Sequence, residues 1–199
     1  MENPIIIYLI AAIGGYLAGS IPFGMLLTRF AGQGDIREVG SGNIGATNVL
    51  RTGSKPLAAA TLLCDLLKGT LPVLVGLSYD LNAGIVAGIA SFIGHIFPVW
   101  LKFKGGKGVA TYLGAVLGLS WPAALGFCGV WLAIAAIFRM SSLAGITASA
   151  LVPLWAYLNG QTDLVWPLAL MAAIIFFTHR ENIARLLQGR ELKIKLGKE

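Results

Sequence analysis

Long apolar runs alternate with short polar segments along the chain. Seven runs approach the roughly 20 residues that a membrane-spanning helix needs, at about 4–27, 56–78, 82–101, 109–120, 121–138, 141–158 and 162–178. Hydrophobic residues make up 56% of the chain and charged residues only 12%, whereas soluble domains carry about 25% charged residues. The pattern predicts an all-α integral membrane protein with about seven transmembrane helices, organised as a single domain over residues 1–199.

The boundary between the fourth and fifth runs decides the number of spans. Trp121-Pro122 separates them, although residues 109–138 could instead form one long kinked helix. Basic residues discriminate between the two interpretations because they concentrate in cytoplasmic loops. Seven spans place 14 of the 15 Lys and Arg residues on one side of the membrane and none on the other, with Lys68 alone inside a span. The 14 are Arg29, Arg37, Arg51, Lys55, Lys102, Lys104, Lys107, Arg139, Arg180, Arg185, Arg190, Lys193, Lys195 and Lys198. We therefore predict seven spans, with the N-terminus outside and the C-terminus in the cytoplasm.

This charge distribution accounts for the formal net charge of +6 without a nucleic-acid partner. The chain shows no basic segment before its first apolar run, so we expect no cleavable signal peptide. Cys64 and Cys128 both lie in apolar runs, which favours buried free thiols over a disulfide. The two histidines are far apart in the sequence, so the pattern predicts neither a metal site nor a metal cofactor.

The first polar loop, VGSGNIGATNVLR from Val39 to Arg51, contains the spacing G-x-G-x-x-G. A dinucleotide site would need a preceding strand, a following helix and an acidic residue about 20 positions on. Asp65 has that spacing but lies in an apolar run, which argues against a nucleotide site. A flexible connector remains one interpretation. The other is an anion-binding nest, because glycines allow close approach of backbone N–H groups and the loop is rich in polar side chains: Ser41, Asn43, Thr47, Asn48 and Arg51.

The second polar loop, KFKGGKGVAT from Lys102 to Thr111, is not a Walker A motif because Gly108 follows Lys107. Positive-inside charge explains its lysines, but it does not explain the glycines at 105, 106 and 108. A phosphate site just before a helix would use both, since N–H groups at a helix N-terminus attract anions. We call residues 102–108 the glycine-lysine loop.

Two shorter polar features allow a structural and a functional interpretation each. Ser141 or Ser142 could cap the sixth helix, or it could bind phosphate through its hydroxyl group. Asp65 and Lys68 lie three residues apart inside the second run. Charges inside a membrane are costly and are usually paired or functional, so an ion pair within one helix is the simplest expectation.

The last polar segment, THRENIARL, follows the seventh run. Thr178 and Glu181 have capping-box spacing, which predicts a structural role for Glu181. His179 and Asn182 are three residues apart and would share one face of a helix. The spacing alone leaves open whether His179 is a catalytic residue or a bystander.

Taken together, three ordered motifs resemble the bacterial acyl-phosphate-dependent glycerol-3-phosphate acyltransferases, the PlsY family. The motifs are GSGNIGATNVLR at 40–51, KGGKGVAT at 104–111 and HRENIARL at 179–186. The resemblance implies acyl transfer from acyl phosphate to the 1-hydroxyl of sn-glycerol 3-phosphate, yielding lysophosphatidic acid and phosphate. It implicates four residues in catalysis: Ser41, Arg51, His179 and Asn182. It assigns glycerol phosphate binding to Lys104, Gly105, Gly106, Lys107 and Gly108.

We expect the site to lie at the cytoplasmic surface of the bacterial inner membrane, where the polar loops meet and the lipid substrate arrives from the bilayer. Asn43, Ser141 and Ser142 complete the candidate substrate-binding residues, and no cofactor is expected. Neither His95 nor His179 has Asp five residues later, so the chain lacks the His-Asp base of thioester-dependent acyltransferases. Direct transfer is therefore preferred over an acyl-serine intermediate on Ser41. The alternative from another class is a transporter of a phosphate-bearing solute, with Asp65 and Lys68 as its main support.

Overall fold

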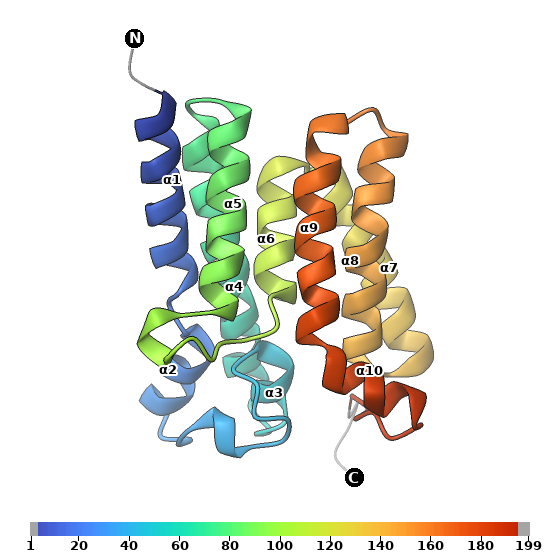
Figure 1. Ribbon diagram of the computed structural model, residues 1–199. Coiled ribbons are helices and arrows are strands. Elements are labelled where there is room, and N and C mark those ends of the chain that lie inside the picture. Colours follow the sequence, from blue (N-terminus) through green and yellow to red (C-terminus); the bar gives the residue numbers. More distant parts are fainter. Residues whose placement is uncertain (1–3, 195–199) are drawn as a thin grey trace. The chain divides into compact units, whose positions relative to one another are not determined.

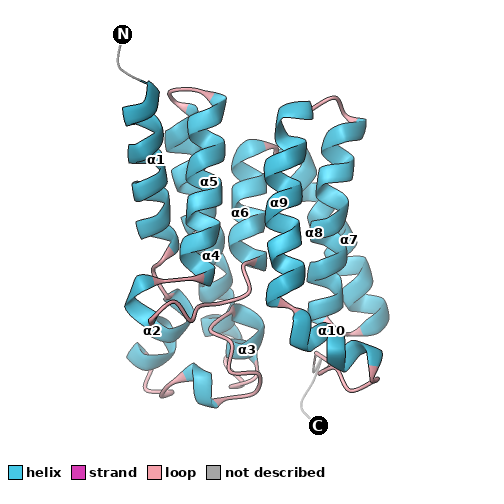
Figure 2. Ribbon diagram, viewed as in Figure 1, coloured by secondary structure: helices cyan, strands magenta, loops and turns pink. Residues whose placement is uncertain are grey.

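The computed structural model describes residues 4–194, and within these residues the chain is helical with no strands (Figures 1 and 2). Its elements are α1 (Pro4–Gly19), α2 (Phe23–Phe30), η1 (Ile36–Glu38), α3 (Ala46–Leu50), α4 (Lys55–Leu77), α5 (Leu81–Ile96), η2 (Val99–Leu101), α6 (Val109–Leu119), α7 (Trp121–Phe138), α8 (Ser141–Leu158), α9 (Thr162–Thr178) and α10 (Arg180–Leu187). The chain divides into two compact units, one ending at Leu119 and the other beginning at Ser120. The prediction of a single domain stays a prediction.

The apolar runs form helices suited to a bilayer, which confirms the all-α membrane fold. Five segments among the described residues are long and apolar enough to span it: Pro4–Phe30, Lys55–Leu77, Leu81–Leu101, Trp121–Phe138 and Ser141–Leu158. A sixth candidate is the pair α9 and α10, which is bent by 62°, and α6 is a shorter apolar helix. Ser120 is extended between α6 and α7, with φ −159° and ψ 93°, so the alternative of one helix over 109–138 is wrong. The predicted orientation of the termini stays a prediction.

The first apolar run is not one helix, which corrects the boundary of 4–27. α1 ends at Gly19, and α2 begins at Phe23 after Pro22. Proline disfavours helical backbone at the preceding residue, here Ile21, and so accounts for the break. α2 then carries the chain into the polar end of the first unit (Figure 1).

Small residues let the helices of the first unit approach closely. A Cβ atom on Gly15 or Gly19 of α1 would overlap backbone atoms of Ala87 or Ser91 in α5. Gly69 of α4 is equally close to the backbone of Thr111 in α6. This is the packing expected in a bilayer, where association depends on close contact rather than on expulsion of water.

One hydrophobic cluster lies beneath the polar loops of this unit. It contains Met25 of α2, Ile36 of η1, Ile44, Val49 of α3 and Ala58 of α4, and Leu101 of η2 packs against it. α2, α3 and the loops before and after them lie at the same end of the unit as the loop between α5 and α6 (Figure 1). The first polar loop and the glycine-lysine loop therefore share one support.

The expected intramembrane ion pair is confirmed. Lys68 Nζ lies 2.7 Å from Asp65 Oδ1 on α4, and both side chains are buried. His95 of α5 joins them, with Nδ1 3.7 Å from the same carboxylate oxygen. Lys68 also donates to the carbonyl oxygen of Ile21 at the α1–α2 break, 2.8 Å away.

The second unit contains α7, α8, α9 and α10. Its polar end holds the α7–α8 turn, α10 and the segment after it, where the amide of Ile194 donates to the carbonyl of Arg139 over 2.6 Å. Neither Cys64 of the first unit nor Cys128 of the second forms a disulfide, as predicted. Five positions used for the orientation lie outside the described residues: residues 1–3, Lys195 and Lys198.

Candidate active site

Asn48 organises the first polar loop. Its side chain is buried, and Nδ2 donates to the carbonyl oxygens of Ile36 over 3.0 Å and Val39 over 2.8 Å. Its Oδ1 accepts from the amide of Ser41 at 3.0 Å. The Ser41 amide, which could take part in an anion-binding nest, is therefore bonded to the Asn48 carboxamide oxygen. These side-chain hydrogen bonds tie the loop to itself and to η1.

Ser41 and Arg51, the two predicted catalytic residues of this loop, are in contact. Arg51 Nη1 donates to Ser41 Oγ at 3.1 Å and to Asn48 Oδ1 at 3.2 Å. Gly40 has φ +57°, and a Cβ there would meet Asn48 Oδ1 and Arg51 Cδ, so glycine is required for this approach. Asn43 is half-buried just before α3. The loop thus holds a guanidinium group, which suits a phosphate because its planar donors can bind two oxygens.

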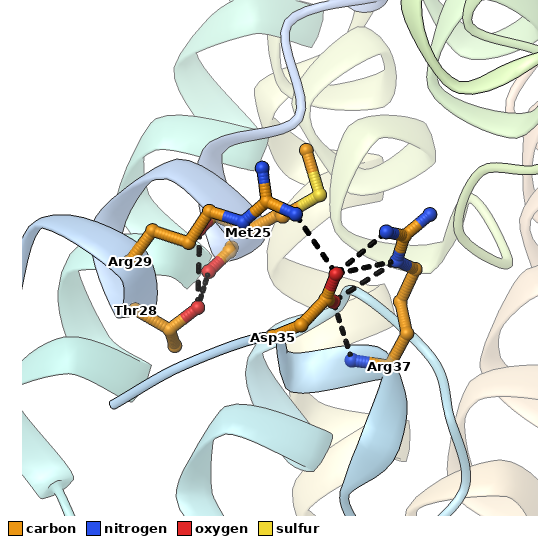
Figure 3. Close-up of polar contacts among 6 residues, drawn as sticks. Met25, Thr28, Arg29, Asp35 and Arg37 are labelled. Carbon is orange, nitrogen blue, oxygen red and sulfur yellow. Dashed lines mark hydrogen bonds and ion pairs between the residues drawn. The ribbon is translucent and has the colours of Figure 1, made fainter. Parts of the chain in front are cut away.

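Asp35 anchors the same loop to α2 (Figure 3). Its carboxylate accepts from the Nε and backbone amide of Arg37, at 2.9 and 3.0 Å, and from Arg29 Nη2 at 2.9 Å. The hydrogen bonds from Arg37, followed by that from Arg29, hold the pKa of Asp35 well below its usual range. Asp35 therefore stays ionised near neutral pH and fixes η1. The carbonyl oxygen of Ile36 in η1 accepts the hydrogen bond from Asn48 Nδ2.

The glycine-lysine loop is tied to the end of α5. The amide of Gly105 donates to Ile96 O at 2.9 Å, and that of Gly106 donates to His95 O at 3.0 Å. A Cβ on Gly105 would overlap both of these carbonyl oxygens, and one on Gly106 would overlap the His95 ring. Both amides are used within the protein and both glycines allow close packing on α5, while the predicted phosphate cradle stays a prediction.

The cationic part of this loop keeps its predicted role as a hypothesis. Lys104 is exposed and Lys107 is half-buried. Gly108 has φ +88°, and a Cβ there would meet the Phe92 ring, so this position also favours glycine for conformation and space. Substrate binding by the lysines and glycines of this loop stays a prediction.

In the second unit, a buried carboxylate joins three elements. Glu191 Oε1 accepts from Ser142 Oγ of α8 at 2.7 Å and from Asn182 Nδ2 of α10, and Oε2 accepts from Arg185 Nε at 2.8 Å. Burial alone would raise the pKa of Glu191, but the hydrogen bonds from Ser142, Asn182 and Arg185 outweigh it and lower the pKa. Glu191 is therefore an ionised organiser of this end of the unit.

Two predicted caps are wrong in this region. α8 begins at Ser141 after Met140, and no side chain caps it, because the Ser142 hydroxyl is directed to Glu191. Thr178 does not begin a capping box: it is the last residue of α9, and its hydroxyl donates to the carbonyl of Ile175 at 3.0 Å. No side chain caps α10 either.

His179 occupies the bend between α9 and α10 and is buried. Its Nδ1 lies 2.9 Å from the carbonyl oxygen of Ile175. A carbonyl only accepts, so Nδ1 carries the proton of this hydrogen bond, and in the neutral ring Nε2 is then the accepting nitrogen. The ring is thereby oriented to accept a hydrogen bond from a hydroxyl group through Nε2.

Comparison with known proteins decides the family. A sequence model described as glycerol-3-phosphate acyltransferase matches residues 9–189. A glycerol-3-phosphate acyltransferase of Brucella anthropi is 58% identical over 184 residues, which is 92% of each chain. One of Mesorhizobium japonicum is 56% identical over 186 residues, covering 94% of this chain and 95% of the relative. The chain belongs to the glycerol-3-phosphate acyltransferase family.

Solved structures agree with this assignment. The crystal structure of PlsY, an integral membrane glycerol 3-phosphate acyltransferase, in its glycerol 3-phosphate form has a TM-score of 0.90 and 41% identity, covering 94% of this chain and 96% of that chain. Its lysophosphatidic acid form has a TM-score of 0.87 and 39% identity, covering 94% of both chains. The resemblance inferred from the three motifs is confirmed. The chain is a multi-pass membrane glycerol-3-phosphate acyltransferase, and the transporter alternative is set aside.

The candidate residues of this acyltransferase divide between its two units. Ser41, Asn43, Arg51 and the glycine-lysine loop belong to the first, and Ser141, Ser142, His179 and Asn182 belong to the second. Sequence reasoning counted Asn48 only among the polar groups of its loop and gave Glu191 no role. The available signal for Glu191 was an acidic residue within an otherwise basic C-terminal segment.

Proposed function

We propose that this acyltransferase takes its acyl group from acyl phosphate and transfers it directly to the 1-hydroxyl of sn-glycerol 3-phosphate. The glycerol oxygen forms a bond to the acyl carbon, and the bond between that carbon and the phosphate oxygen breaks. The proton of the hydroxyl passes to the departing phosphate. The products are lysophosphatidic acid and inorganic phosphate.

The fixed guanidinium of Arg51 is the observation that carries this proposal. Both substrates bear phosphate, and Arg51 is held by Ser41 and Asn48 in a loop with two left-handed glycines, Gly40 and Gly42. A positioned cation stabilises charge on the transferring group without reorganising during the reaction. Lys104 and Lys107, on the neighbouring glycine-lysine loop, supply the further cations that a second phosphate needs.

The surroundings of Ser41 support direct transfer over an acyl-serine intermediate. The hydroxyl of Ser41 accepts from Arg51 and lies 3.3 Å from Asn48 Oδ1. Neither partner is a base that would take the serine proton, and an arginine favours the hydroxyl as an acceptor. An acyl phosphate is already activated, so orientation and charge stabilisation suffice. We assign Ser41 to substrate positioning.

His179 and Asn182 are assigned to the acceptor alcohol and the developing oxyanion. With Nδ1 donating to Ile175 O, Nε2 of the neutral His179 ring accepts the hydrogen bond of the glycerol hydroxyl, takes its proton as the bond to the acyl carbon forms, and passes that proton to the departing phosphate. Glu191 fixes the amide orientation of Asn182. Ser142 donates to the same Glu191 carboxylate, so we assign it to the hydrogen-bond network that positions Asn182. Ser141 and Asn43 complete the proposed substrate-binding residues.

The proposed site faces the cytoplasm of the bacterial inner membrane. The support is the distribution of basic residues, which places the motif loops on the positive side. The acyl donor reaches such a site from the bilayer, and glycerol 3-phosphate reaches it from the aqueous side.

The donor is tested with purified protein in lipid nanodiscs, palmitoyl phosphate and labelled glycerol 3-phosphate. We expect labelled lysophosphatidic acid and phosphate in equal amounts, and no product when palmitoyl-CoA replaces palmitoyl phosphate. Arg51→Lys keeps the charge but loses the planar fork, so it should lose most activity, whereas the neighbouring Thr52→Ala should not. Comparable turnover with palmitoyl-CoA would overturn the donor assignment.

The direct mechanism is tested by omitting the acceptor. Protein incubated with palmitoyl phosphate alone is quenched and measured by intact mass. We expect no mass increase, since no covalent intermediate forms. An acyl adduct that appears in the parent protein and disappears in Ser41→Ala would establish the intermediate on Ser41 instead.

A further inference from the structure

A line of buried charged groups lies beneath the glycine-lysine loop. Lys68 Nζ pairs with Asp65 Oδ1 at 2.7 Å, and His95 Nδ1 lies 3.7 Å from the same oxygen. The far end is fixed as well: Lys68 donates to Ile21 O, and the hydroxyl of Ser91 on α5 donates to Lys68 O at 2.6 Å. No role in the proposed reaction uses these groups. A charge held inside a membrane needs a partner and usually a function.

The other end of this line is the loop itself. The His95 ring lies against Gly106, where a Cβ would overlap Nε2, Cε1 and Cδ2. The carbonyl of His95 receives the Gly106 amide, and that of Ile96 receives the Gly105 amide. His95 therefore contacts the loop through its ring and through its backbone, while Asp65 Oδ1 lies 3.7 Å from Nδ1 on the other side of the ring, a contact longer than a hydrogen bond.

The loop needs such support because part of its backbone is strained. Lys102 and Phe103 are non-glycine residues with left-handed φ values of 52° and 61°. Conformations of this kind cost on the order of 1 kcal/mol each and persist when the surrounding structure determines them. The buried His95 ring, which lies between Asp65 and Gly106, supplies a surface for the backbone between Lys104 and Lys107.

We propose that Lys68, Asp65 and His95 act as a positioning relay for the glycine-lysine loop. Lys68 holds Asp65, Asp65 orients the His95 ring, and the ring sets the backbone that carries Lys104 and Lys107 toward the phosphate of glycerol 3-phosphate. These are positioning residues that touch no substrate. The inference rests on the proposed function only in assigning the two lysines to that phosphate.

The first test removes both charges together. Asp65→Leu combined with Lys68→Met replaces the pair with apolar side chains of similar volume, a change that is often neutral for stability. We expect the thermal midpoint to be retained while KM for glycerol 3-phosphate rises about tenfold and KM for acyl phosphate and kcat change little. A stable double variant with the parent KM for glycerol 3-phosphate would overturn the relay.

The second test uses the close contact between the ring and Gly106. Gly106→Ala alone should raise KM for glycerol 3-phosphate about tenfold, because its Cβ displaces the ring. In a His95→Ala background the space is open, so adding Gly106→Ala should change KM less than about twofold. If Gly106→Ala raises KM by the same factor in the parent and in the His95→Ala background, the effect does not pass through the His95 ring and the relay is overturned. Gly84→Ala is the matched control: Gly84 lies on α5, the helix that carries His95, and an added Cβ would meet the Leu77 side chain instead. It should leave KM unchanged.

A measurement without substrate separates this inference from the proposed function. The Gly105 and Gly106 amides are hydrogen-bonded and should exchange slowly with deuterium. Their exchange should accelerate in the Asp65→Leu/Lys68→Met variant and stay slow in Gly84→Ala. If exchange accelerates while Lys104→Gln and Lys107→Gln leave KM unchanged, the relay stands and the substrate assignment of the loop fails. Unchanged exchange would overturn the relay.

Discussion

Replacement of Asn48 by alanine should impair catalysis although Asn48 was not among the predicted site residues. The side chain donates to Ile36 O and Val39 O and accepts from the Ser41 amide, so three hydrogen bonds with the backbone are lost, in addition to the contacts of Oδ1 with Arg51 and the Ser41 hydroxyl. At about 0.5–1.5 kcal/mol each, the loss sums to about 1.5–4.5 kcal/mol. Ser41 is exposed, so water can replace its bond and the cost should lie in the lower half of that range.

The effect on activity should exceed the effect expected of a structural residue alone, because Asn48 also holds Arg51. If Arg51 loses its charge-assisted contact with the transition state, the transition state loses about 1.5–3 kcal/mol of stabilisation. This corresponds to a decrease of about 10- to 150-fold in kcat/KM. The assay is initial rate against both substrates at 25 °C, on protein shown to be folded by its thermal midpoint. Thr52→Ala is the control: its hydroxyl oxygen lies 2.8 Å from both Gln33 Oε1 and Val49 O, outside the candidate site, and kcat/KM should stay within about twofold.

A double variant tests the route of the effect. If Asn48 acts through Arg51, Asn48→Ala should add little to the loss already caused by Arg51→Gln, because residues that act as a unit are not additive. A folded Asn48→Ala protein with parent kcat/KM would refute the reasoning, and so would full additivity with Arg51→Gln.

Three further predictions address stability, topology and cofactors. The lowered pKa of Glu191 stabilises the fold fully above the ordinary glutamate pKa of about 4.3, and this contribution is lost as the pH falls through the folded value. Glu191→Gln should therefore lower the thermal midpoint at pH 7, and the difference from the parent should shrink as the pH falls below the ordinary glutamate pKa. A difference that is constant with pH would exclude the linkage. Asn82→Cys and Asn159→Cys should react with an impermeant maleimide added outside intact cells, and Glu38→Cys and Gln188→Cys should react only after permeabilisation; the reverse pattern would invert the proposed orientation. Activity should survive excess chelator, and restoration of a lost activity by one specific divalent metal would contradict the absence of a metal requirement.

The sequence alone determined the membrane fold, because lipid leaves few choices. Backbone groups in a bilayer must bond within their own segment, so each long apolar run has to be a helix. The spacing of Asp65 and Lys68 made a local ion pair the simplest expectation, because two opposite charges about one turn apart can pair within one helix. The three motifs identified the family, since their order and chemistry are specific even where each one alone is weak.

Tertiary structure decided how the polar residues are used. Asn48 binds carbonyls 12 and 9 positions earlier, and Ser142 meets Glu191 across 49 positions, which no local pattern encodes. The sequence could not distinguish a glycine that admits phosphate from a glycine that admits a neighbouring helix. Gly105 and Gly106 pack closely on the end of α5, because a missing Cβ only offers space and the fold decides what fills it.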